Sequence, residues 1–482
     1  MRFLINLSLA VSVLVAAIPT DNTKPTAQNI ELNLVPGTES FSLPDPKFPI
    51  QFTQRHSSFA NPDYFWAMRP LNIQDVSTIV KFCNQHNFSY MATGGGHGTS
   101  IGFANVKGAI DIDLSKFNKI SLYKDDNLVT VGAANVLADF ADTLYKAGKE
   151  IRKQPPLSLP TTSTDTHRNS HRQLPCVSAI GATIGAGVGP MQGLHGLMID
   201  SLRSVRMVTP NGDIVTASQT ENPDLFWAHV NADFEFPPTS HVGLFQLLQS
   251  WDSDDVFPKE MSLSVTIGYD HETNSPTLSA SVYYFGPHAA AKPYLQKLVD
   301  LNPTKWHNET LGWNGMTQAA GFGQTFAKAC VRGKYTNHWT AGIRQTDPVT
   351  WPGLFASFAK WSSTRPWVKG SIILQRYNAK VTQQLPEAQQ GAYPWRDIGT
   401  LVLMKATYDG PTHDAEVGAF YEQLRDRIYK TSGFLGAPRV YINYANGDEG
   451  AGLWYGPNLV RLRRLKEKWD PENRFGAGFS IS

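Results

Sequence analysis

The chain has 482 residues, of which 41% are hydrophobic and 17% are charged, and its formal net charge is +2. This length exceeds the size at which a single hydrophobic core stops growing, so two domains are expected. The small net charge and the lack of a long Lys/Arg cluster in the sequence exclude nucleic acid as a serious partner. With three cysteines and no paired spacing, a disulfide scaffold and a thiolate zinc site are excluded too, and no metal is expected.

Residues 1–17 are typical of a secretion signal. Arg2 precedes an apolar run that reaches Ile18, with small residues at the spacing that signal peptidase recognises. The run is shorter than the about 20 apolar residues that a membrane span needs. We therefore expect a secreted, soluble chain without a membrane span. Asn87 and Asn308 lie in Asn-x-Ser/Thr sequences and are candidate glycan acceptors.

The next elements predict a first α+β domain. Apolar residues at helical spacing follow Asn72, a good N-cap, and indicate a helix over 72–87. A glycine-rich stretch, TGGGHGTS at 93–100, precedes GAIDIDLS at 108–115, which alternates with the strand period of two. Two further strands about a polar turn and a helix are then predicted, from ISLYKDDNLVTVGA and NVLADFADTLYKAGK.

A second glycine-rich segment follows a long predicted loop. Residues 152–175 are rich in Pro, Ser and Thr and show no apolar period, which favours an exposed loop. CVSAIGATIGAGVGPMQGLHGLMIDS then occupies 176–201. The hairpin expected after it has Asn211 and Gly212 at its tip, a pair that fits a type I′ turn.

Beyond residue 239 the pattern predicts a second α+β domain. Longer amphipathic helices such as AAAKPYLQKLVDL are mixed with strands such as MSLSVTIGY and TLVLMKATY. Near the end of the chain, Leu459, Leu462 and Leu465 share one face of a helix that Pro471 should terminate.

The two glycine-rich segments and His97 form the candidate cofactor site. Glycine lets backbone N–H groups approach a pyrophosphate closely, although a glycine-rich turn also serves an awkward backbone path. The first segment is not a Walker loop, because no Lys follows, and a strand rather than a helix comes after it. On the residues alone, His97 is a structural histidine, a general base, a covalent attachment point or, least favoured, a metal ligand.

Taken in order, these motifs resemble the berberine-bridge-enzyme-like oxidoreductases of the vanillyl-alcohol-oxidase superfamily. The resemblance rests on MATGGGHGTSIG, GAIDIDLSKFNKI, AIGATIGAGVG, NPDLFWA and the terminal VYINYANGDEG to DPENRF, which span most of 45–228 and 436–482. It implies a two-domain α+β fold with a PCMH-type FAD-binding domain at 40–238, completed by 441–482. The substrate domain would occupy 239–440, as an antiparallel sheet covered by helices.

The resemblance also implies the cofactor and its contacts. FAD would be linked covalently to His97, and the remaining contacts would come from Thr93, Gly94, Gly95, Gly96, Gly98, Thr99, Ser100, Ile180, Gly181, Gly185, Gly187 and Asn443. Many relatives carry a second flavin link through cysteine, but alignment of the glycines places that residue near Leu174. Cys176 is therefore expected to be inert, with a second link as the minor alternative, and Cys83 and Cys330 are expected to be small buried residues.

The function implied is FAD-dependent oxidation of a small organic substrate, with hydride passing to flavin N5 and O2 as the acceptor. A fungal secondary metabolite is the expected substrate class, and a sugar or oligosaccharide is the alternative. Tyr441, Tyr444 and Tyr377 are the candidate catalytic groups, with packing as the alternative role of each. Gln375 shares a strand face with Tyr377. The sequence does not define the oligomeric state.

Two segments depart from the family pattern. One is the loop 152–175, and the other is HVNADFEFPPTSHVG at 229–243, where the family has a glycine-rich segment against the flavin. The second departure predicts weaker cofactor binding. It also raises the alternatives of a misassembled gene and of a degenerate paralogue that has lost flavin function.

Overall fold

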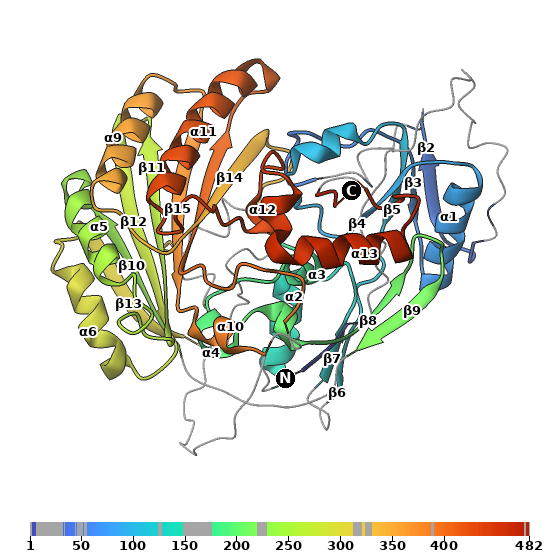
Figure 1. Cartoon of the computed structure of the whole chain (residues 1–482), viewed down its shortest axis with the longest axis horizontal. Coiled ribbons are helices and arrows are strands. Elements are labelled where there is room, and N and C mark those ends of the chain that lie inside the picture. The colour runs from blue at the N-terminus through green and yellow to red at the C-terminus, as the bar shows by residue number, and fades with distance from the viewer. Residues whose placement is uncertain are drawn as a thin grey trace.

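The computed structural model describes residues 2–5, 32, 34–43, 45, 52, 55–123, 128–147, 176–218, 229–311, 321–322, 330–386, 390–476 and 479–481. The predicted loop 152–175 and Leu174 lie outside these residues. Figure 1 shows a helix-covered sheet beside a second body that holds two smaller sheets. Among the described residues, none of the helices combines the length and the hydrophobicity needed to cross a bilayer.

The first domain begins with a four-stranded sheet in the order β2 (Glu39–Ser42), β3 (Tyr64–Arg69), β5 (Ala109–Asp113) and β4 (Tyr90–Thr93). Helix α1 (Ile73–Gln85) packs its apolar face on this sheet. Asn72 caps the helix as predicted, because its side chain accepts a hydrogen bond from the Asp75 N–H at 2.9 Å. Strand β5 is buried along its whole length, so its alternating sequence does not mark a half-exposed strand.

The second sheet of this domain has the order β6 (Ile120–Tyr123), β7 (Leu128–Val131), β1 (Arg2–Ile5), β8 (Leu202–Val208) and β9 (Ile214–Ser218). Helices α2 (Leu137–Lys146), α3 (Ala179–Ile184) and α4 (Gln192–His195) follow β7 in the chain. The predicted type I′ turn between β8 and β9 is wrong. Gly212 has φ +83°, but Asn211 has no positive φ, and the connection spans Thr209 to Asp213.

Strand β1 falls within the predicted secretion signal. It lies between β7 and β8 and runs parallel to both. A chain cleaved after residue 17 would lack this strand, so cleavage and the five-stranded arrangement are alternative fates of the segment.

The second domain is a seven-stranded antiparallel sheet. Its order is β13 (Lys305–Leu311), β10 (His229–Phe236), β12 (Ser275–Tyr284), β11 (Met261–Asp270), β15 (Lys369–Tyr377), β16 (Thr400–Thr407) and β14 (Thr336–Ile343). Helices α5 (His241–Ser250), α6 (His288–Val299), α9 (Thr350–Ser363) and α11 (Asp414–Thr431) cover one face (Figure 1). Their apolar side chains and those of the sheet form one large core.

The departure at 229–243 becomes β10 and the start of α5. Strand β10 pairs with β12 on one side and β13 on the other, so the sheet of the second domain begins before residue 239. Its alternating residues explain this position. Phe234 points into the helix-covered core, while Asn231 and Asp233, also buried, occupy the opposite face.

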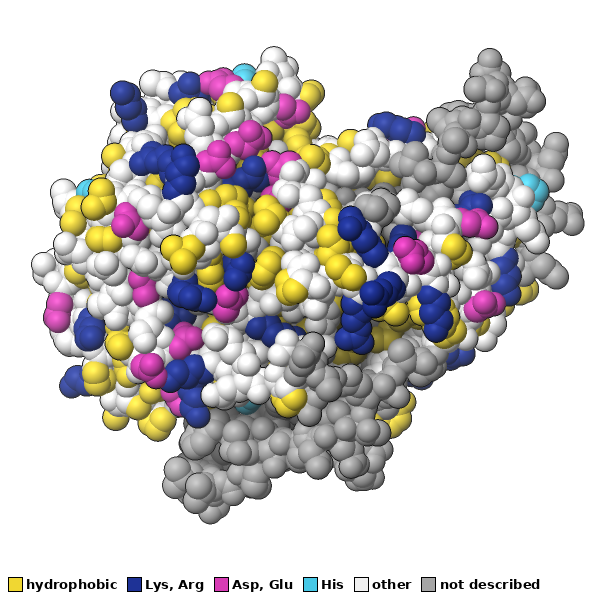
Figure 2. Space-filling model, in the orientation of Figure 1, with side chains coloured by type: hydrophobic (Ala, Val, Ile, Leu, Met, Phe, Trp, Pro, Cys, Tyr) yellow, Lys and Arg dark blue, Asp and Glu magenta, His cyan; other side chains and the backbone are white. Residues whose placement is uncertain are grey.

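The chain ends on the first domain through α12 (Ala451–Tyr455) and α13 (Leu459–Trp469). The short helix α10 (Lys380–Gln384) comes earlier, between β15 and β16. The predicted terminal helix is present and ends before Pro471. None of its residues is buried among the described part of the molecule, and Leu465 is 43% exposed, so the expected apolar face is at most half-buried. Figure 2 shows Lys and Arg side chains along the surface where α13 runs.

Candidate functional site

The loop 93–100 follows β4, and residues elsewhere in the chain donate hydrogen bonds to its backbone carbonyl groups. Three of its glycine carbonyls accept hydrogen bonds from distant residues: Gly95 from the Arg332 guanidinium at 3.0 Å, Gly96 from the His56 backbone N–H at 3.0 Å, and Gly98 from the Arg55 guanidinium at 2.9 Å. Because these hydrogen bonds fix its carbonyl groups, the loop keeps one conformation without the backbone hydrogen-bond ladder of a β-sheet.

The backbone N–H groups of the same loop, in contrast to its carbonyl groups, have no hydrogen-bond partners among the described residues. Within the described residues, no hydrogen bond is made by a backbone N–H from Gly94 to Ser100. Consecutive free N–H groups form a concavity that binds anions, and buried backbone donors are otherwise nearly always paired. The loop can therefore hold a pyrophosphate without a dedicated cation.

The two predicted glycine-rich segments meet at Gly95. A Cβ at Gly95 would lie 2.9 Å from the backbone N of Ser178, and one at Gly94 would lie 2.9 Å from the Ala133 carbonyl oxygen. Ser178 is the N-cap of α3 and accepts a hydrogen bond from the Gly181 N–H at 3.4 Å. The first half of the second segment, including the buried Ile180, thus lies directly behind the loop.

The second half of that segment contacts the end of the chain. A Cβ at Gly185 would lie 1.9 Å from the Asn443 side-chain oxygen, and Gly187 has φ +71° and faces Met198. Asn443 donates to the Ala182 carbonyl at 3.1 Å and to the Tyr441 hydroxyl at 2.9 Å. The C-terminal motif therefore packs on the first domain through Asn443.

His97 presents an unused nitrogen. Its Nε2 is buried and has no hydrogen-bond partner among the described residues, and its ring stacks on that of His56 at 4.3 Å. Burial lowers the pKa of His97 to about 3, and the nearby His56, Arg332, Arg55 and Lys405 act in the same direction. The imidazole is therefore neutral at physiological pH. A neutral ring with a free lone pair suits covalent attachment of a flavin, so the residues fit FAD.

Other basic groups surround His97. The His338 ring is hydrogen-bonded to the Thr99 hydroxyl at 3.1 Å. His338 also pairs with Lys405 across strands β14 and β16. Burial lowers the pKa of His56 to about 4 and lowers that of Lys405. Sequence reasoning missed this cluster, because its members are distant along the chain.

Asp111 lies beneath the loop and was also missed. It is fully buried, and one of its oxygens accepts a hydrogen bond from the Thr93 hydroxyl at 2.6 Å. Burial raises the pKa of Asp111 to about 8, so the carboxyl group is largely protonated at pH 7.

The three candidate tyrosines come together at the junction of the two domains. Tyr377 and Tyr441 belong to one apolar cluster, against which Tyr444 packs. The rings of Tyr441 and Tyr444 are 4.9 Å apart, and the Tyr444 hydroxyl donates to the Gln375 side-chain oxygen at 3.0 Å. Tyr441 in turn accepts a hydrogen bond from the Val188 N–H at 3.3 Å.

Burial raises the pKa values of both Tyr441 and Tyr444. Both phenols therefore keep their protons at neutral pH and present O–H donors. In this state each hydroxyl can donate a hydrogen bond to a neighbouring group, and the catalytic role of the tyrosines stays a prediction.

A small cavity of about 10 Å³, roughly the space of one water molecule, lies beside the tyrosines and is called the pocket below. Its lining is mainly apolar and aromatic and consists of Val188, Gln192, Leu197, Tyr377, Thr382, Tyr393, Trp395, Arg396, Ile398 and Leu401. The Gln192 side-chain oxygen is buried without a partner in the described residues, and the Arg396 guanidinium pairs with Asp200 at 2.8 Å. Tyr393 and Arg396 belong to the stretch AYPWRD, which is similar to a family motif but carries no predicted role, and Gln192 and Trp395 were missed.

The cysteines differ from expectation. Cys176 and Cys330 form a disulfide with a Cα–Cα distance of 5.9 Å, so the prediction of Cys330 as a small buried residue is wrong. In this state Cys176 has no thiol for a flavin link. Cys83 is free and buried, as predicted. No cluster of potential metal ligands occurs in the part of the chain that the structure describes.

Comparisons with known proteins agree with this geometry. A family model for an FAD binding domain matches residues 66–163, and one described as berberine and berberine like matches residues 440–482. The FAD-linked oxidoreductase tazL of Aspergillus terreus is 42% identical over 463 residues, which cover 90% of each chain. The FAD-linked oxidoreductase azaL of Aspergillus niger is 33% identical over 464 residues, covering 90% of this chain and 94% of its own.

Solved structures show the same fold at low identity. Physcomitrella patens BBE-like 1 superposes with a TM-score of 0.75 and 17% identity, over 92% of this chain and 97% of its own. The glucooligosaccharide oxidase from Acremonium strictum, described with a 6-S-cysteinyl, 8α-N1-histidyl FAD, gives a TM-score of 0.73 and 19% identity over the same fractions. At these identities the likeness concerns the fold alone.

Proposed function

The chain belongs to the berberine-bridge-enzyme-like family of FAD-linked oxidoreductases, and we propose that it holds FAD covalently through His97 and oxidises a small aromatic substrate. The observation that carries the proposal is the buried, neutral His97 nitrogen beside a loop whose N–H groups are free in the described structure. Bound FAD would supply the two-electron acceptor, and O2 is the proposed final oxidant.

The loop 93–100 would bind the pyrophosphate, and Asn443 would fix the second glycine-rich segment. Tyr444 directs its hydroxyl proton to the Gln375 oxygen, which leaves the Gln375 amide N–H groups for a substrate oxygen. Tyr441 is held by Asn443 and Val188 and so keeps the tyrosine pair in place.

The residues that line the pocket favour an aromatic substrate, for which the walls of this small cavity would have to move apart. Tyr377, Tyr393 and Trp395 provide large, flat surfaces, and Gln192 offers one unpaired acceptor. Such a lining matches a phenolic or polyketide-derived secondary metabolite better than a polyol, which needs many polar contacts.

A sugar or oligosaccharide oxidase is the second candidate. The sheet face that points to the first domain carries Ser281, Ser264 and Gln375 side by side on β12, β11 and β15. A row of hydroxyl and amide groups of this kind suits a polyol. Release of H2O2 from a panel of phenols and oligosaccharides separates the two substrate classes.

The covalent link is tested by intact mass and acid precipitation. The wild-type protein should carry one FAD that stays with the precipitated polypeptide, whereas His97→Ala should release it. His307→Ala, which removes an exposed histidine paired with Glu309 in the second domain, is the control and should retain the flavin. A folded, colourless wild-type protein would instead support a degenerate paralogue.

We also propose that the protein enters the secretory pathway. Disulfides persist in oxidising compartments, which supports this assignment for the Cys176–Cys330 pair. The side chains of Asn87 and Asn308 are exposed and accessible to glycosylation. N-terminal sequencing of the secreted protein should begin near Ile18, and a glycosidase should reduce its mass. An intact N-terminus would contradict the proposal and favour retention of β1 in the sheet.

A further inference from the structure

A buried arginine lies between the two residues that β15 contributes to the site. Arg376 follows Gln375 and precedes Tyr377, and its side chain is 4% exposed. Each of its five N–H groups is used, by the carbonyl oxygens of Trp251 (3.1 Å), Asp252 (3.0 Å), Tyr377 and Gly399 (3.0 Å) and by the Asp254 carboxylate (2.7 Å). The guanidinium therefore joins the segment 251–257 to the ends of two strands.

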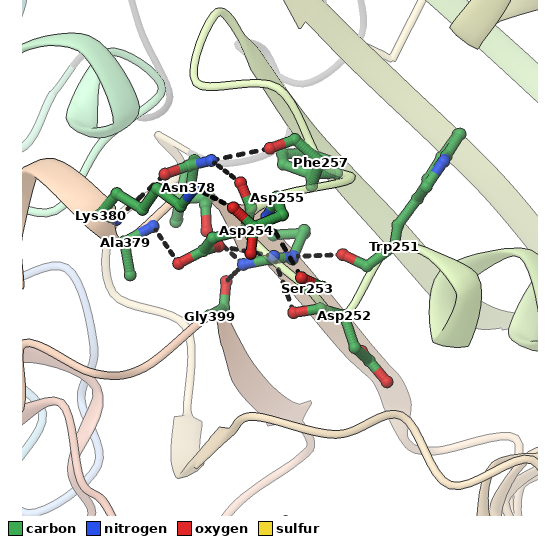
Figure 3. Close-up of polar contacts among 12 residues, drawn as sticks. Trp251, Asp252, Ser253, Asp254, Asp255, Phe257, Asn378, Ala379, Lys380 and Gly399 are labelled. Carbon is green, nitrogen blue, oxygen red and sulfur yellow. Dashed lines mark hydrogen bonds and ion pairs between the residues drawn. The ribbon is translucent and has the colours of Figure 1, made fainter.

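Asp254 extends this junction to the next helix. One carboxylate oxygen binds Arg376, and the other accepts the Ala379 N–H at 3.0 Å, just before α10. The Asn378 amide donates to the carbonyl oxygens of Asp254 at 2.8 Å and Phe257 at 2.7 Å. Figure 3 shows these contacts converging from the segment 251–257 and from residues 378–380.

The junction supports the walls of the pocket without lining it. The Tyr377 N–H donates to the Gly399 carbonyl at 3.0 Å, so both partners of this bond are also fixed by Arg376. In α10, the Thr382 hydroxyl binds the Ala379 carbonyl at 2.7 Å and the Arg396 carbonyl at 2.9 Å. Tyr377, Thr382 and Arg396 line the pocket, whereas Arg376 and Asp254 do not.

We propose that the Arg376–Asp254 pair is a positioning device that sets the distance between the walls of the substrate pocket, and so sets substrate affinity. The inference rests on the proposed function, since it takes this pocket to hold the substrate. Removing one member leaves the other charge buried without its partner, which displaces the groups it held. Displacements near 1 Å at a binding wall are enough to change substrate handling.

Asp254→Asn and Asp255→Asn form a matched pair of variants. Asp255 is the neighbouring residue, but its side chain is 78% exposed and pairs with Lys380 at the surface, where ion pairs contribute little. With the phenol that the wild type oxidises fastest, Asp254→Asn should raise KM by roughly tenfold, with kcat within about threefold of wild type. Flavin content should stay unchanged, and Asp255→Asn should match the wild type throughout.

A second measurement does not depend on a substrate. Hydrogen exchange of the full-length protein should be faster at residues 377–384 in Asp254→Asn and unchanged there in Asp255→Asn. If no phenol is oxidised, the proposed function fails while the exchange comparison still decides this inference. Asn378→Ala, which keeps both charges, should raise KM in the same direction and serves if Asp254→Asn does not fold. A lower unfolding temperature with wild-type KM and wild-type exchange at 377–384 would overturn the inference.

Discussion

Adding one methyl group at Gly95 tests whether the two glycine-rich segments meet as described. A Cβ at this position would lie 2.9 Å from the Ser178 backbone N and 3.0 Å from its Cβ. Gly95 has no positive φ, so any loss in the Gly95→Ala variant comes from this contact rather than from backbone strain. The obstructing atoms are backbone or close to it, and they cannot rotate away.

Overpacking of this kind costs about 1–3 kcal/mol. At about 2–4 °C per kcal/mol for a domain of this size, a cost near 2 kcal/mol lowers the unfolding temperature by roughly 4–8 °C. We expect a second effect on the cofactor. A shift of the loop moves the N–H groups of 94–100, so the fraction of protein with covalently retained flavin should fall.

The matched control is Gly189→Ala, because a Cβ at Gly189 meets no atom within 4 Å. Tryptophan fluorescence during heating reports stability, and absorbance of the acid-precipitated protein reports bound flavin. Equal unfolding temperature and flavin content in Gly95→Ala and Gly189→Ala would refute the contact between the loop and Ser178.

Three further changes probe other parts of the site. Tyr444→Phe removes the hydroxyl that orients Gln375, and kcat/KM should fall by about tenfold with flavin content unchanged, as steady-state kinetics and absorbance can check. Folding raises the pKa of Asp111 from near 3.9 to about 8, so its contribution to stability is complete below pH 4 and is lost as the pH rises through 8. Asp111→Asn should therefore gain most in unfolding temperature over the wild type at pH 9, and an equal difference at pH 5 would contradict this. Reduction of the Cys176–Cys330 disulfide should lower the unfolding temperature, because it opens a loop closed across 154 residues, and an unchanged melting curve would argue against the disulfide.

Local signals in the sequence were sufficient for the elements that carry the site. The Asn72 cap and the apolar spacing after it define α1, and the glycines at 94–98 define the loop that follows β4. The groups that fix this loop were not predictable in the same way. Arg55 is 43 residues from Gly98, and Arg332 is 237 residues from Gly95, so their contacts depend on the assembled fold.

The corrections have the same physical origin. Cys330 was expected to be a packing residue because nothing in its neighbourhood points to Cys176, 154 residues away. The segment 229–236 is an unfamiliar sequence for the family, yet it is an ordinary strand once β12 and β13 lie on either side of it. Asp111 occupies an alternating strand that is buried on both faces, which periodicity alone cannot indicate.

A glycine-rich segment in a sequence can serve the packing of the chain itself or can expose backbone N–H groups to a ligand, and the two segments of this protein differ in this respect. At Gly185 the missing side chain admits Asn443, and at Gly187 it permits a positive φ beside Met198, so both glycines are explained by the chain itself. The loop 93–100 differs from the second segment. Gly94 and Gly95 lie against Ala133 and Ser178, and the backbone N–H groups from Gly94 to Ser100 have no acceptor in the described residues. The proposed pyrophosphate site would therefore depend on the first segment, while the second joins the C-terminal motif to the tyrosine cluster.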